Sequence, residues 1–114
     1  MKLILLSILM ISVFATPVPA QKKFETDIIK TSDGELKITF LGHGSLLLNY
    51  KNSNIYIDPF SKLADYAALP KAEIIFLTHH HRDHLDQNAL KQIRSQKTEL
   101  VLTELCKKLR TEQS

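Results

Sequence analysis

The sequence predicts an α/β (α+β) fold, in which helices pack on a β-sheet. Residues 35–41 alternate between apolar and polar side chains, which is the period of a half-buried strand. Residues 74–77 are apolar at every position, as in a central strand that is covered on both faces. Helix, strand and helix patterns follow, and this order predicts a sheet with helices packed on it.

The length and composition fit one globular domain. The chain has 114 residues, of which 44% are hydrophobic and 24% are charged. The net charge is only +3, and the basic residues near the end of the chain are interleaved with acidic and apolar ones. We therefore expect a solvated helix face there and no nucleic-acid partner.

Residues 1–20 have the plan of a signal peptide. Lys2 precedes an apolar run that ends at Phe14, and small residues follow up to Ala20. The run is shorter than the roughly 20 apolar residues that a membrane-spanning helix needs. We expect cleavage after Ala20 and a secreted or periplasmic protein that has no membrane association afterwards; an uncleaved anchor is the alternative. Residues 21–35 form an N-terminal extension.

The next segments are expected to form three strands and a loop. Glycines around His43 break the first strand, and the turn-forming residues 51–53 separate the second from the third, so these two make a hairpin. Asp58 and Pro59 end the third strand, because proline has no backbone donor to continue a ladder. A loop or short helix then runs to Pro70. The strands are residues 35–41, 45–50 and 54–57.

The second part of the chain is expected to form strand, helix, strand and helix. Asp86 caps the first helix, and Leu90 and Ile93 share one of its faces. Thr103 caps the second helix. The single cysteine, Cys106, is expected to be a partly buried apolar residue, with metal ligation or an intermolecular disulfide as alternatives. The elements are residues 73–78, about 87–95, 99–102 and those after 103.

Four of the five histidines fall between positions 79 and 84. Residues two apart in an extended segment point the same way, so His79 and His81 can close on one metal ion. Asp83 and His84 can hold a second ion if the chain turns back there. Zinc takes imidazole nitrogen and carboxylate oxygen, although iron, manganese or nickel also suit such ligands. A helix that pairs His80 with His84, or an exposed polar loop, is the alternative.

This segment resembles the His-x-His-x-Asp-His motif of the metallo-beta-lactamase superfamily. Residues 38–45 resemble the opening strand and loop of its branch of metal-dependent hydrolases, which also resembles ascorbate-phosphate lactonases. Residues 55–59 resemble the superfamily's first motif. The resemblance implies the N-terminal half of the metallo-beta-lactamase αββα sandwich, as a truncated domain over residues 36–114.

The resemblance also implies roles for individual residues. His79 and His81 would bind a first zinc ion, and Asp83 and His84 would bind a second, so that one or two ions are held. Asp58 would accept the free N–H of a ligating histidine and so orient it. As a residue before Pro59, it can equally be a simple turn residue.

Two further residues of the resembling segments have open roles. His43 would lie beside the metals, in contact with substrate or with a ligand; a surface turn histidine is the alternative. Arg82 departs from the motif, where small residues are frequent. It can pair with a substrate anion or remain solvated.

The expected function is that of a zinc-dependent hydrolase with a small-molecule substrate. A metal-bound hydroxide would attack an ester, lactone or phosphoester, with Asp83 as the catalytic residue that holds and orients the water. The family's remaining ligands come from the second half of its domain, and no histidine follows His84. The alternative is therefore a non-catalytic exported metal-binding half-domain, or an inactive fragment, that needs a partner chain or self-association to complete the sheet.

Overall fold

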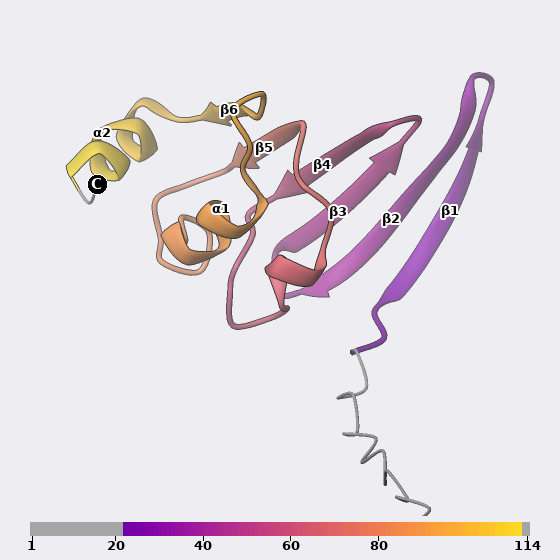
Figure 1. The fold of residues 1–114 in the computed structure, drawn as a ribbon, viewed down its shortest axis with the longest axis horizontal. Coiled ribbons are helices and arrows are strands. Elements are labelled where there is room, and N and C mark those ends of the chain that lie inside the picture. The colour runs from indigo at the N-terminus through magenta and orange to yellow at the C-terminus, as the bar shows by residue number, and fades with distance from the viewer. Residues whose placement is uncertain (1–21, 113–114) are drawn as a thin grey trace, which may run out of the picture.

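The computed structural model describes residues 22–112, so the predicted signal peptide lies outside the described residues. Its centre is a six-stranded sheet with the order β1-β2-β3-β4-β5-β6 (Figure 1). The first four strands form an antiparallel meander, and β4, β5 and β6 are parallel. The strands are β1 (Glu25–Thr31), β2 (Gly34–Gly42), β3 (Ser45–Tyr50), β4 (Ser53–Ile57), β5 (Ile74–Leu77) and β6 (Glu99–Leu102).

The predicted α/β (α+β) class and the order of its elements are confirmed. Strand β1 lies within residues 21–35, which the sequence pattern predicts only as an N-terminal extension. Thr31 pairs with Gly34 across a two-residue turn, and β1 adds to the edge of the sheet through backbone pairing with β2. All of its residues are exposed, so no alternation of buried and exposed positions marks it.

The helices begin where their capping residues predict. The Asp86 carboxylate accepts hydrogen bonds from the N–H groups of Asn88 and Ala89 and so caps α1 (Gln87–Ile93). The Thr103 hydroxyl accepts from the N–H of Cys106 at the start of α2 (Glu104–Glu112). A short 3-10 helix, η1 (Tyr66–Ala68), occupies the loop after β4. Across residues 22–112, no helix is long and apolar enough to cross a membrane.

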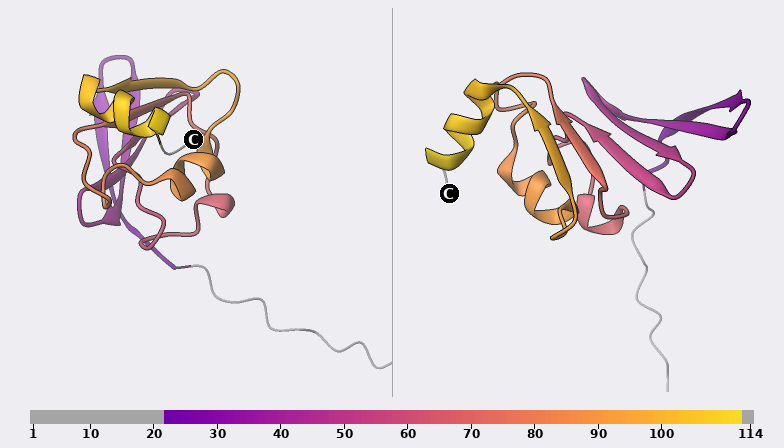
Figure 2. Two further views of the ribbon diagram at one scale, coloured as in Figure 1. Left: turned by 90° about the vertical axis from the view of Figure 1, so that its left-hand side faces the viewer. Right: turned by 90° about the horizontal axis from the view of Figure 1, so that it is seen from above.

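The hydrophobic core lies on one face of the sheet. Helices α1 and η1 pack on this face, as the two views of Figure 2 show. Leu90 and Ile93 of α1 are buried as predicted, and Cys106 of α2 is fully buried rather than partly so. The buried strand residues that meet them alternate along each strand; they are Leu41, Leu47, Tyr56, Ile75 and Leu77.

The opposite face of the sheet is also apolar, but no described element covers it. Phe40 and Phe76 keep 40% and 38% of their surface exposed there, although their strand neighbours Leu41 and Ile75 are buried. The strand register aligns these side chains in continuous rows from β2 to β6. We call this surface the open face; its apolar residues are Leu36, Ile38, Phe40, Leu46, Leu48, Ile55, Ile57, Ile74, Phe76 and Val101.

Candidate metal centre

The predicted site residues gather at one edge of the sheet. Strands β4 and β5 are parallel, so Asp58 and His79, which follow them, leave the sheet at the same edge. His43 lies in the turn between β2 and β3, where Gly42 pairs with Ser45. The Ser45 hydroxyl donates to the backbone carbonyl of Asp58, which joins this turn to the end of β4.

A tight turn then brings Asp83 and His84 back toward the sheet. The N–H groups of His84 and Leu85 both donate to the carbonyl of His81, at 2.9 and 2.8 Å. The helix α1 begins only at Gln87, so the alternative of His80 and His84 paired on one helix is wrong. A turn, not a helix, folds the motif back on itself.

Asp58 is buried and holds the base of the site together. Its Oδ1 accepts from the N–H of Thr78 at 2.8 Å, and its Oδ2 accepts from the Thr78 hydroxyl at 2.5 Å. The same Oδ2 lies 2.7 Å from Nδ1 of His84. Asp58 takes up a left-handed backbone conformation with φ 43°, which is uncommon for a residue other than glycine and typical of functional positions.

These contacts fix which nitrogen of each histidine is free. An ionised carboxylate only accepts hydrogen bonds, so Nδ1 of His84 carries the proton that faces Asp58, and a neutral ring keeps its lone pair on Nε2. The Thr78 hydroxyl gives its own hydrogen to Asp58 and lies 2.9 Å from Nδ1 of His79. It therefore accepts from His79, whose Nε2 is left free in the same way. Thr78 is a positioning residue that the sequence analysis missed.

Asp83 lies between two imidazole rings. Its Oδ2 is 2.7 Å from Nε2 of His43 and 3.3 Å from Nε2 of His84. Desolvation raises the pKa of Asp83, but hydrogen bonds to its carboxylate, first from the His43 ring and then from the backbone, outweigh this effect and lower the pKa below its usual value. Asp83 is therefore ionised at neutral pH.

The contact between Asp83 and His84 leaves room for a cation. With Nδ1 of His84 protonated, its Nε2 lone pair and the Asp83 carboxylate are two acceptors that face each other at 3.3 Å. Such a pair repels unless a second proton or a metal ion lies between the atoms. Two ligands on a tetrahedral zinc ion, with bonds of about 2.0–2.1 Å, are themselves about 3.3 Å apart. The spacing of the two atoms therefore matches that of two ligands on one metal ion.

Within residues 22–112, two groups of side chains bring their ligand atoms within 4.8 Å of one another, and both include His84. One group adds His43 and Asp83, and the other adds Asp58 and His79. Both oxygens of Asp58 already accept hydrogen bonds, so we assign it to orienting His84 rather than to binding metal directly. His81 belongs to neither group, although its ring centroid lies 4.7 Å from that of His79.

Gly44 makes the approach of His84 possible. A Cβ atom at position 44 would lie 3.0 Å from Cε1 of His84, closer than ordinary van der Waals contact. His43, the residue before it, has φ 50°. Gly44, which the sequence indicates only as a strand breaker, therefore also shapes the wall of the site.

Comparisons with known proteins agree with this fold. A family model described as a beta-lactamase superfamily domain matches residues 37–111, which is more than half of the chain. The crystal structure of a protein from Parabacteroides distasonis, named as a metal-dependent hydrolase, is 46% identical in sequence, with a TM-score of 0.74. The match covers 76% of this chain and 40% of that protein, so this chain spans less than half of its relative.

Proposed function

Because this chain belongs to the beta-lactamase superfamily, we propose that it acts as a metal-dependent hydrolase on an ester, lactone or phosphoester bond of a small molecule. The observation that carries the proposal is the position of His84 between two carboxylates. Asp58 holds its Nδ1, and Asp83 faces its Nε2 at 3.3 Å. The metal-dependent hydrolase named among the relatives supports the same reaction class.

We propose that His79, His81, Asp83 and His84 hold one or two zinc ions. Imidazole and carboxylate donors suit zinc, while iron, manganese and nickel accept the same donors. A bound ion would supply positive charge that activates water and polarises the bond to be cleaved. His81 lies outside both ligand groups, so its ring has to move toward the other ligands before it can bind the metal.

The residues of the chain itself have separate tasks in this proposal. Asp83, ionised at neutral pH, accepts a hydrogen bond from the attacking water and orients it toward the substrate. Asp58 holds the Nδ1 proton of His84, and Thr78 does the same for His79, so that both Nε2 atoms point their lone pairs outward. His43 contacts Asp83 and fixes the rotamer of this carboxylate.

Metal content and hydrolysis test the proposal together. The full chain is purified, dialysed exhaustively and analysed for metals, alongside His79→Ala, His81→Ala and His84→Ala. His80→Ala is the matched control for metal content, because it removes a histidine of the same loop that is not among the four proposed ligands. We expect bound zinc in the wild type and in this control, and neither bound zinc nor ester, lactone or phosphodiester hydrolysis in the other variants. Turnover in the ligand variants equal to that of the wild type would refute the hydrolase.

A second candidate is a non-catalytic metal-binding half-domain, and the open face is the observation that favours it. Ten apolar side chains in register form a surface of the kind that packs against another sheet. A partner chain, or a second copy, would cover this face and add the ligands that the described residues lack. Two results together would favour this candidate. The purified chain would bind zinc without hydrolysing the test substrates, and hydrolysis would appear only after a second polypeptide is added.

We further propose that the protein is exported to the periplasm or secreted. The charged, apolar and small-residue segments of residues 1–20 support this location. Expression of the full chain in a bacterium, followed by fractionation and N-terminal sequencing, tests it. A mature protein that begins at Gln21 outside the cytoplasm is expected, and an intact Met1 in the cytoplasm would contradict the proposal.

A further inference from the structure

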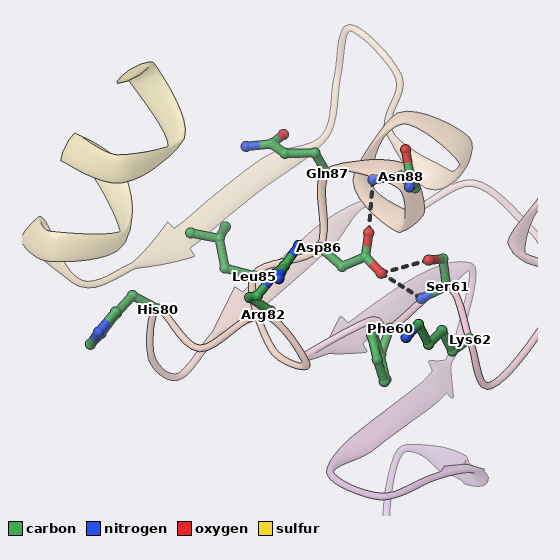
Figure 3. Close-up of a pocket in the computed structure, with 9 residues that line it drawn as sticks. All are labelled: Phe60, Ser61, Lys62, His80, Arg82, Leu85, Asp86, Gln87 and Asn88. Atoms are coloured by element: carbon green, nitrogen blue, oxygen red, sulfur yellow. Dashed lines mark hydrogen bonds between the residues drawn. The ribbon is translucent and has the colours of Figure 1, made fainter. Parts of the chain in front are cut away.

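A cavity of about 640 Å³ lies beside the histidine loop, on the side of His80 and Arg82 (Figure 3). Its wall comes from three segments: residues 60–62 after β4, the loop after β5, and the start of α1. None of the residues in the two ligand groups lines it. The cavity is therefore a separate feature that shares a loop with the candidate metal centre.

The wall carries two permanent cations that have no protein anion to pair with. Within residues 22–112, neither Lys62 nor Arg82 forms an ion pair with a carboxylate. The Lys62 ammonium lies only over the Phe60 ring, at 6.0 Å from its centroid. Both side chains are exposed and free to turn toward a ligand.

The one acid in the wall, Asp86, is already fully engaged. Its Oδ2 accepts from the N–H and the hydroxyl of Ser61, at 2.8 and 2.6 Å, and its Oδ1 accepts from the N–H of Asn88 at 2.8 Å (Figure 3). Asp86 thus ties α1 to the loop after β4. It balances one of the two positive charges and leaves the wall positive.

We propose that this cavity binds the oxyanion group, a phosphate or a carboxylate, of a small organic molecule. Arg82 and Lys62 neutralise its charge and donate hydrogen bonds to its oxygens. Phe60 and Leu85 line the same cavity and accommodate the apolar part of the molecule. The inference rests on the proposed function in one respect, because the bound molecule is taken to be the substrate of the hydrolase. The anionic group of this substrate would face the loop that carries the metal ligands.

Binding of small anions to the metal-free full chain tests this inference without any need for turnover. The metal is removed with a chelator, the chelator is removed by dialysis, and inorganic phosphate and acetate are then titrated separately by calorimetry. We expect Arg82→Ala and Lys62→Ala to weaken binding by about tenfold or more, since each removes a charge-assisted hydrogen bond. Lys97→Ala is the matched control, because it removes the same charge from an exposed position outside the cavity and should bind as the wild type does.

The unfolding temperature separates a binding role from a structural one. Arg82 and Lys62 are exposed, so their alanine variants should unfold at the wild-type temperature while their anion affinity falls. Binding of phosphate alone identifies the group as a phosphate, and binding of acetate alone as a carboxylate. Failure of both anions to bind, or equal affinity in Lys97→Ala and Arg82→Ala, would overturn the inference. If the protein binds the anion but hydrolyses no substrate, the proposed hydrolase function is wrong, whereas the proposed anion site stands.

Discussion

Asp58 Oδ2 lies 2.7 Å from His84 Nδ1, and this contact joins the end of β4 to the turn after β5. The two residues are far apart in sequence, and both are largely buried, with 4% and 14% of their side chains exposed. The carboxylate fixes the tautomer of His84 and points its other nitrogen at Asp83.

Asp58→Asn should weaken metal binding while the side chain keeps its shape. The amide cannot accept hydrogen bonds on both of its terminal atoms, so the orientation of His84 becomes poorer. Loss of a partner of this kind typically costs about 10- to 100-fold in metal affinity. Competition with a chromogenic zinc chelator measures the change. Asp27→Asn, at an exposed position of β1, is the control and should leave the affinity as it is.

Thr78→Val should also lower metal affinity, because it removes the hydroxyl between Asp58 and His79 without changing the shape of the side chain. Thr78→Ser keeps the hydroxyl and should restore most of the affinity. The same chelator competition compares the three proteins. If the valine and serine variants bind zinc equally, the hydroxyl does not orient His79.

Gly44→Ala should displace the His84 ring. The added methyl group would lie 3.0 Å from its Cε1, and overpacking of this kind costs about 1–3 kcal/mol. Chemical denaturation should show the lower stability, and NMR signals of the His84 ring should shift. If both the stability and the ring signal stay unchanged, the site accommodates the added methyl group without moving His84, and this prediction is wrong.

Stability should fall in alkaline solution because of two buried tyrosines. Burial raises the pKa of Tyr56 and of Tyr66, although for Tyr66 the hydrogen bond from the N–H of Phe60 offsets part of the effect. The folded state then keeps protons that the unfolded state loses near the ordinary pKa of about 10, so stability declines as the pH rises above that value. The double variant Tyr56→Phe/Tyr66→Phe should lose less stability than the wild type between about pH 9 and pH 12, as measured by urea unfolding.

Two neighbouring residues of β5 should respond differently to truncation. Ile75 is fully buried under the helices, whereas Phe76 lies on the open face with 38% exposure. Ile75→Ala should cost about 2–5 kcal/mol in unfolding free energy, and Phe76→Ala distinctly less. A cost for Phe76→Ala as large as that for Ile75→Ala would mean that the open face is covered in solution. Sedimentation of the wild type at several concentrations would then identify a second copy as the cover.

Local patterns in the sequence were sufficient for most elements of the fold. Alternation and apolar runs gave β2 through β6, and Asp86 and Thr103 marked the helix starts, because periodicity and capping depend on neighbours along the chain. Strand β1 was not predicted, because it pairs at the edge of the sheet through backbone groups and none of its side chains is buried. The Asp33-Gly34 pair, a common turn signal, was the clue that could have revealed its hairpin.

The sequence by itself indicated the candidate site residues: the histidine-rich segment after an apolar strand, Asp58 before a proline, and His43 between glycines. Only the tertiary structure decided how they combine. It placed Asp58 beneath His84 and Asp83 against His43, inserted Thr78 as a bridge to His79, and left His81 outside both ligand groups. The physical reason is that the spacing of the ligands along the chain is a local property of the sequence. The partner of each ring nitrogen depends instead on the strand register and on the turn after β5, and both form only when the sheet assembles.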